Sequence, residues 1–216
     1  MTPLILFYSP GACSLAVHAA LEDTGVEYER VRVDLRQKQQ LAPDYLRFNP
    51  QGRVPTLVAD GQPLTEVVAI ADFLDQVFPE ARLMPRDPQA RALDMSAVQR
   101  LSSDIHPLYR ALWIPGWFAD DASAHESLKA TATRRLGEFH AELEQRLANG
   151  RWGHGEPTGF LAYYTAVFLR WSSAVAPLGL GPHCEALRAR MAVQPAMARA
   201  MATEGIRLDS LARDSD

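Results

Sequence analysis

A cysteine follows a short apolar run near the N-terminus, at a position where a thiol could do chemistry. Residues 3–8 predict a buried strand, and Ser9-Pro10-Gly11 predicts the turn that closes it. Cys13 then stands just before a helix predicted over Ser14–Thr24. Free N–H groups and the helix dipole favour an anion there, so the position predicts a lowered pKa for the Cys13 thiol. A thiolate at this place could attack a disulfide or be capped by a small thiol.

Two hydroxyl groups flank this cysteine in the sequence. Tyr8 precedes the turn and Ser14 follows Cys13 directly, so both could donate a hydrogen bond to a nearby sulfur. The alternative interpretation is that Cys13 is a small buried apolar side chain, as most lone cysteines are.

A second motif, Asn49-Pro50-Gln51-Gly52-Arg53-Val54-Pro55, enters a predicted strand through a proline. We expect the Val54–Pro55 peptide bond to be cis, which would leave the backbone of Val54 free to pair with an extended peptide. An ordinary trans proline at the start of a strand is the alternative.

A third motif, Leu64-Thr65-Glu66-Val67, opens a predicted amphipathic helix over Thr65–Phe78. The N–H groups at such a helix start can hold a carboxylate, and Glu66 could accept from an ammonium group of the same ligand. Simple capping by Thr65 is the alternative.

The elements that must position these motifs form an α/β unit. Their order along residues 1–80 is strand, helix, strand, irregular helix, hairpin and helix, which predicts a four-stranded mixed sheet with helices on both faces. Residues 79–88 are rich in proline and charge, and this stretch predicts a linker over residues 81–87. Residues 88–216 show no strand-like alternation and predict an all-helical domain, with helices over 89–106, 123–148, 160–176, 184–192 and 196–203.

Composition excludes several classes of function. The 216 residues carry a net charge of −4 without a dense basic run, so we expect no nucleic-acid partner. No apolar stretch is long enough to cross a bilayer, and the start of the chain lacks a basic segment typical of secretion signals. The two cysteines, Cys13 and Cys184, are far apart, and the histidines show no spacing typical of metal ligands. We therefore expect a cytoplasmic protein without a metal.

Taken together and in this order, the three motifs resemble the glutathione-binding domain of glutathione transferases. The sequence Ser9-Pro10-Gly11-Ala12-Cys13-Ser14 is similar to that of the bacterial beta class, and so is Leu169-Arg170-Trp171 in the helical part. The resemblance implies a thioredoxin-like front domain, glutathione as co-substrate, and a homodimer. It also implies conjugation of glutathione to a hydrophobic electrophile, with thiol–disulfide exchange through Cys13 as a further activity.

The resemblance implies a role for each matching residue. Cys13 would lie opposite the glutathione sulfur, with Tyr8 and Ser14 nearby, and His106 of Asp104-Ile105-His106 would stand over that sulfur and shuttle a proton. The residues implied in binding glutathione are Lys38, Val54, Pro55, Glu66, Val67, Gln99 and Ser103.

Some positions depart from the family pattern. Val67 stands where serine or glycine is usual, and Gln99 stands where asparagine is common. Pro107 predicts that the helix ends near His106. A capping box is missing at Gly159-Phe160-Leu161-Ala162, which puts the stability of the core helix in doubt.

Two alternatives to the transferase reading stay open. One is a glutathione-dependent disulfide reductase or peroxidase, and the other is a non-catalytic binding or regulatory protein with the same fold. A run of aromatic side chains after His106 could wall a hydrophobic co-substrate site, or equally belong to the helix core or a dimer contact; it comprises Tyr109, Trp113, Trp117 and Phe118.

Overall fold

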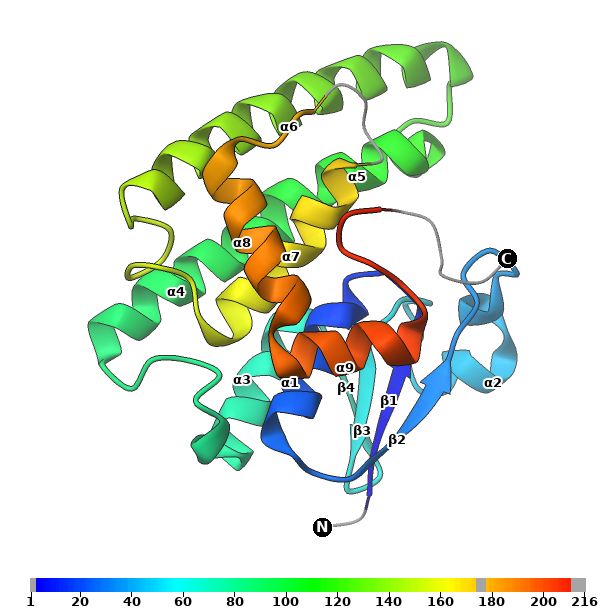
Figure 1. The fold of residues 1–216 in the computed structure, drawn as a ribbon. Coiled ribbons are helices and arrows are strands. Elements are labelled where there is room, and N and C mark those ends of the chain that lie inside the picture. The colour runs from blue at the N-terminus through cyan, green and yellow to red at the C-terminus, as the bar shows by residue number, and fades with distance from the viewer. Residues whose placement is uncertain (1–2, 174–177, 211–216) are drawn as a thin grey trace.

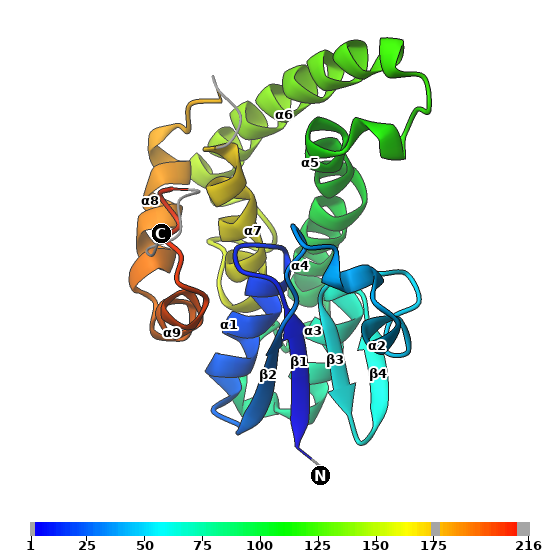
Figure 2. The same ribbon diagram turned by 90° about the vertical axis from the view of Figure 1, so that its right-hand side faces the viewer.

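The chain folds into a mixed sheet flanked by helices and followed by a helical bundle (Figures 1 and 2). The computed structural model describes residues 3–173 and 178–210. The strands are β1 (Leu4–Tyr8), β2 (Tyr28–Arg32), β3 (Thr56–Ala59) and β4 (Gln62–Thr65), and their order in the sheet is β2-β1-β3-β4. β1 and β2 are parallel, whereas β3 is antiparallel to both β1 and β4. The predicted four-stranded mixed sheet is therefore confirmed.

Helices cover both faces of this sheet. Successive side chains of β1 point to opposite faces, and both sets are apolar, so each face needs a helix to cover it. Leu4 and Leu6 join the main core on the face covered by α1 (Ser14–Thr24) and α3 (Val67–Val77). Phe7 points to the other face, where it packs against Tyr45 of α2 (Pro43–Leu46) in a smaller cluster. The hydrophobic alternation of the first strand thus decides which helix lies on which side.

The helical part stands against the end of the sheet at which β1 ends (Figure 2). α7 is buried along its whole length and packs against α1, because its sequence is apolar on every side. α9 packs against the other side of α1. The α-helices of this part are α4 (Pro88–Arg100), α5 (His106–Trp113), α6 (His125–Ala148), α7 (Gly159–Ser172), α8 (Pro182–Val193) and α9 (Pro195–Glu204). Short 3-10 turns lie at Gln39–Leu41, Pro79–Ala81, Pro115–Trp117 and Ala122–Ala124.

The prediction that the helix ends near His106 is wrong. A π-helical segment, Leu101–Ile105, joins α4 to α5, and the chain stays helical through Pro107 to Trp113. Pro107 lies just after the π-helical segment, and the wider turn of that segment accommodates a residue without an N–H inside a continuous helix.

Two predicted helix starts also differ from the structure. Thr65 lies in β4 opposite Thr56 rather than capping a helix, and α3 begins at Val67 after Glu66. The start of α7 has no side-chain cap, but the N–H of Phe160 donates to the carbonyl of Leu83 at 2.9 Å. A backbone oxygen from the predicted linker thereby replaces part of the missing capping box.

The last residues of the helix predicted over 160–176 lie outside the described residues. Among the helices that the structure describes, none is long and apolar enough to cross a membrane. No cluster of three potential metal ligands occurs within residues 3–173 and 178–210.

Candidate active site

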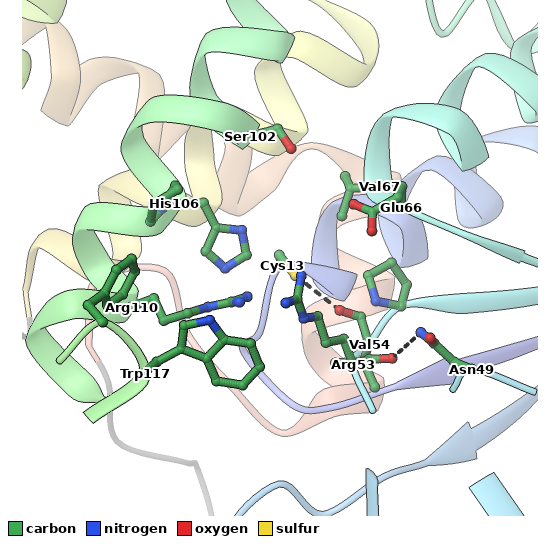
Figure 3. Close-up of a pocket in the computed structure, with 13 residues that line it drawn as sticks. Cys13, Asn49, Arg53, Val54, Glu66, Val67, Ser102, His106, Arg110 and Trp117 are labelled. Carbon is green, nitrogen blue, oxygen red and sulfur yellow. Dashed lines mark hydrogen bonds between the residues drawn. The ribbon is translucent and has the colours of Figure 1, made fainter. Parts of the chain in front are cut away.

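A pocket of about 280 Å³ lies between the sheet unit and the α4–α5 region (Figure 3). Cys13 before α1, the turn before β3 and the start of α3 form one wall, and the π-helical segment, α5 and the 3-10 turn after it form the other. Its lining residues are Cys13, Asn49, Arg53, Val54, Pro55, Glu66, Val67, Ser102, His106, Pro107, Arg110, Trp117 and Phe118.

Cys13 lies at the base of this pocket, directly before α1, but its thiol is not acidic. Only 6% of the residue is exposed, and its Sγ donates a hydrogen bond to the carbonyl of Val54 at 3.3 Å. Burial raises the pKa of the Cys13 thiol to about 12, although the charge of Arg110 and N–H groups at the helix start act in the opposite direction. The predicted lowering of this pKa is therefore wrong, because loss of water outweighs the helix dipole.

The turn that carries Cys13 is held in place by the helical part. The N–H of Gly11 donates to Glu204 Oε2 of α9 at 2.7 Å, and its carbonyl accepts from Trp171 Nε1 of α7 at 2.9 Å. Glu204 Oε1 also lies 2.8 Å from Nδ1 of the buried His18. A Cβ at Gly11 would lie 2.6 Å from the guanidinium of Arg170, so only glycine fits this contact. The Leu169-Arg170-Trp171 motif thus positions the turn.

The other two motifs meet Cys13 in the same pocket. The Val54–Pro55 peptide bond is cis, which confirms that prediction. Glu66 adopts a left-handed φ of 69° directly before α3, and Glu66 and Val67 both line the pocket. The first N–H groups of α3 have no acceptor inside the helix, so this edge suits a carboxylate.

His106 enters the pocket from α5, and its ring points toward Cys13 (Figure 3). The imidazole packs against Trp171 with ring centroids 5.1 Å apart. Burial lowers the pKa of His106 to about 4, and the charges of Arg110 and Arg53 lower it further. His106 is therefore a neutral ring at physiological pH, able to donate one N–H or accept one proton.

Tyr8 and Ser14 do not line the pocket. The Tyr8 ring packs on His18, with centroids 5.1 Å apart, on the face of the sheet that α1 covers. The hydroxyl of Ser14 accepts from the N–H of Ser9 at 3.1 Å and lies 3.2 Å from its carbonyl. Ser14 thus bonds the backbone of the turn, and neither side chain lines the pocket.

Three of the predicted binding residues also lie away from the lining. Lys38, Gln99 and Ser103 are exposed and contribute nothing to the pocket wall, whereas Ser102 does. The sequence interpretation missed four lining side chains, Asn49, Arg53, Ser102 and Arg110. Asn49 and Arg53 belong to the motif that ends in Pro55, so that motif was the available signal for them.

The predicted aromatic run divides between core and pocket. Tyr109 is buried, and its hydroxyl lies 2.9 Å from Nε2 of His140. Trp117 and Phe118 line the pocket and remain 56% and 47% exposed. The core interpretation therefore holds for Tyr109, whereas a co-substrate wall formed by Trp117 and Phe118 stays a prediction.

A four-stranded mixed sheet with a cis proline beside a cysteine, joined to a helical bundle, places the protein in the class of thioredoxin-like folds that carry a helical second domain. Residues 2–76 match the model of the glutathione S-transferase N-terminal domain. The chain is 32% identical to glutathione S-transferase GstA of Escherichia coli O157:H7 over 207 residues, which covers 94% of this chain and 99% of that protein.

Solved structures agree with this relationship. A glutathione transferase homologue from Sulfitobacter with bound glutathione superposes with a TM-score of 0.85 at 29% identity, over 94% of this chain and 99% of that one. The beta-class glutathione S-transferase of Sphingomonas chungbukensis gives a TM-score of 0.75 at 32% identity, over 93% and 98% of the two chains. The chain belongs to the glutathione S-transferase family.

Proposed function

We propose that this protein binds glutathione in the pocket at Cys13 and conjugates it to a hydrophobic electrophile. The observation that supports this most is the meeting of Cys13, Val54, Glu66 and His106, from both parts of the chain, around one pocket. A peptide with a thiol in the middle and an amino-acid group at one end matches the chemistry of these side chains.

The binding mode follows from the placement of these groups. The γ-glutamyl end would meet Glu66 through its ammonium group and the N–H of Val67 through its carboxylate. The cysteinyl backbone would pair with Val54, whose carbonyl now accepts from the Cys13 thiol. The glutathione sulfur would then lie between Cys13 and His106.

Transfer requires glutathione to react as a thiolate. A protonated Cys13 thiol and a neutral His106 ring can each donate a hydrogen bond to that sulfur, and Arg110 adds positive charge to the same pocket. These interactions strengthen as the thiol ionises, so they favour the reactive form of glutathione rather than of Cys13. The raised pKa of Cys13 for this reason favours transfer over disulfide exchange as the main activity.

Binding is tested by calorimetric titration of glutathione into the protein and a Glu66→Gln variant. We expect Glu66→Gln to weaken binding about tenfold or more, because a charge-assisted hydrogen bond is lost. Glu27→Gln changes an exposed carboxylate outside the pocket and serves as the control. Equal affinity of both variants for glutathione would contradict the proposed orientation.

Transfer is tested with 1-chloro-2,4-dinitrobenzene and with mass spectrometry of the protein with and without reductant. Cys13→Ala should abolish any glutathione adduct while part of the transfer rate remains, and His106→Ala should lower transfer without preventing the adduct. Binding without transfer to any electrophile would favour the non-catalytic alternative. Loss of all transfer in Cys13→Ala would contradict the expectation that the remaining donors suffice to ionise glutathione.

The remaining expectations concern the cellular location and the oligomeric state of the protein. We also propose that the protein works in the cytoplasm and forms a homodimer, as the family resemblance implies. A monomer by light scattering at micromolar concentration would contradict the dimer.

A further inference from the structure

Two arginine side chains converge on one tryptophan at the mouth of the pocket. The guanidinium carbons of Arg53 and Arg110 lie 5.0 Å and 5.1 Å from the ring centroid of Trp117. Arg53 belongs to the turn before β3 and Arg110 to α5, so the pair is assembled from both parts of the chain (Figure 3).

Neither guanidinium of this arginine pair has an acidic partner. Within the described parts of the chain, no carboxylate lies within 4.0 Å of Arg53 or Arg110, and the buried Nε of Arg53 has no hydrogen-bond partner. Other partly buried arginines are paired, as Arg91 is with Asp75 and Arg100 with Glu142. Among the described residues, the positive charge of the pair thus has no carboxylate in direct contact with it, and Glu66 acts on Arg110 only from a distance.

The two like charges act on each other and on their surroundings. Burial lowers the pKa of Arg110, and the charge of Arg53 lowers it as well. Glu66 is the single carboxylate among the described lining residues, and it lies at the opposite side of the pocket from Arg110 (Figure 3). Two cations held together in this way favour an anion between them.

An exposed apolar surface continues outward from the arginine pair. It runs from the end of α5 through the following 3-10 turn and is formed by Trp113, Ile114, Trp117 and Phe118, which are 47%, 56%, 56% and 47% exposed. A flat apolar body would cover these side chains while its charged end reaches the guanidinium groups.

We propose that Arg53 and Arg110 form a carboxylate subsite for the electrophilic co-substrate, which is therefore an aromatic or conjugated acid. The inference rests on the proposed transferase function and names the substrate class of that site. Arg110 lies one helical turn after His106, so a carboxylate held there places the adjoining ring next to the sulfur at Cys13.

A carboxylate at the arginine pair could also come from glutathione, which ends in a glycyl carboxylate. If that carboxylate filled the arginine pair, both guanidinium groups would serve glutathione binding and would not select the electrophile. The experiment must therefore measure the two ligands separately.

A matched pair of electrophiles separates these cases. 4-Chloro-3-nitrobenzoate and its methyl ester share one reaction: the glutathione thiolate adds at the carbon bearing chlorine, a C–S bond forms, and the C–Cl bond breaks. Chloride leaves with the electron pair, and the thiol proton goes to solvent. Each rate is divided by its uncatalysed rate, because the two rings differ in reactivity.

We expect Arg53→Gln and Arg110→Gln to lower kcat/KM for the acid at least about tenfold relative to the ester, mainly through KM. Arg110→Gln should also lower the rate with both electrophiles, because Arg110 favours the glutathione thiolate, so the acid-to-ester ratio of kcat/KM is the diagnostic quantity for that variant. The affinity of Arg53→Gln for glutathione should stay within about twofold. Arg134→Gln is the matched control, because it removes one positive charge from an exposed pair with Glu138 on α6. This control should leave the ratio of kcat/KM for the acid to kcat/KM for the ester unchanged.

Direct calorimetric titration of the acid alone tests the subsite without turnover, so its result is separate from failure of the transferase proposal. Binding of the acid that disappears in both variants supports the proposal. An unchanged ratio of acid to ester overturns it. An unchanged ratio with weaker glutathione binding, and with no such loss for the glycyl ethyl ester of glutathione, assigns the arginines to glutathione instead.

Discussion

Replacing Glu204 with alanine should destabilise the protein more than any exposed substitution on the same helix. Its carboxylate accepts from the N–H of Gly11 at 2.7 Å and lies 2.8 Å from Nδ1 of His18, and the side chains of His18 and Glu204 are both fully buried. Alanine leaves two buried polar groups without a partner, at about 1–3 kcal/mol each. Breaking a buried pair costs about 3–5 kcal/mol, so we expect a loss of about 4 kcal/mol.

Thermal unfolding followed by circular dichroism measures this loss. For a chain of this size, about 4 kcal/mol corresponds to a drop in Tm of about 8–16 °C. Arg199→Ala is the control, because Arg199 lies on the same helix and pairs with Glu22 while 54% of its side chain is exposed. We expect that variant to lose at most about 1 kcal/mol.

Glutamine at position 204 separates the hydrogen bonds from the charge. Burial raises the pKa of Glu204, which means that the environment disfavours the ionised carboxylate. A neutral amide keeps an oxygen for the N–H of Gly11, so Glu204→Gln should lose only about 1 kcal/mol. If Glu204→Ala melted at the same temperature as Arg199→Ala, the carboxylate would not hold the Cys13 turn, and the reasoning would fail.

Two further predictions concern stability. Gly159→Ala should lower the free energy of unfolding by about 2 kcal/mol or more, because φ is +50° and a Cβ would lie 2.4 Å from the carbonyl of Leu83. Gly150→Ala is the control: φ is +59° but the space around it is open, so the loss should be about 1 kcal/mol. Equal urea midpoints for both variants would rule out the linker contact. Burial lowers the pKa of His140 to about 4, so between about pH 6.5 and 4 the unfolded chain binds a proton that the native protein excludes. Stability should therefore fall as the pH drops through this range, by about 2–3 kcal/mol from this residue, and urea titrations should show a shallower fall in His140→Gln.

Much of the front domain follows from the sequence because local signals there agree with the fold. Strand alternation, the Val54-Pro55 element and the helix after Glu66 all act over a few residues, and the structure contains each of them. The same alternation held a signal that the sequence interpretation did not use. Tyr8 has the parity of Leu4 and Leu6, which places its ring in the core and not in the pocket.

The rest depends on contacts between distant segments. The pKa of Cys13 is set by burial under the helical part, and the position before a helix carries no information about that burial. Arg53 and Arg110 are 57 positions apart, the difference of their sequence numbers, and only the fold shows that they share Trp117 without an acidic partner. Such an arrangement has no local sequence pattern.

The choice of Ser102 over Gln99 and Ser103 has a related cause. Regular helical periodicity assigns faces with 3.6 residues per turn, but the π-helical segment Leu101–Ile105 has a wider turn. A count of 3.6 residues per turn that starts in α4 therefore assigns the wrong helix face to residues from Leu101 onward, just before His106.

That wider turn makes chain length a determinant of the site. A π-helical turn holds about one residue more than an α-helical turn, so deleting one residue from Leu101–Ile105 would let the segment relax to a regular α-helix while α5 keeps its orientation. The same deletion in a regular stretch of α4 has no wider turn to absorb it, so it would rotate His106 and Arg110 by about 100° away from Cys13. Among related chains, the loss of one residue within Leu101–Ile105 should therefore disturb the site less than the loss of one residue elsewhere in the helix that carries His106.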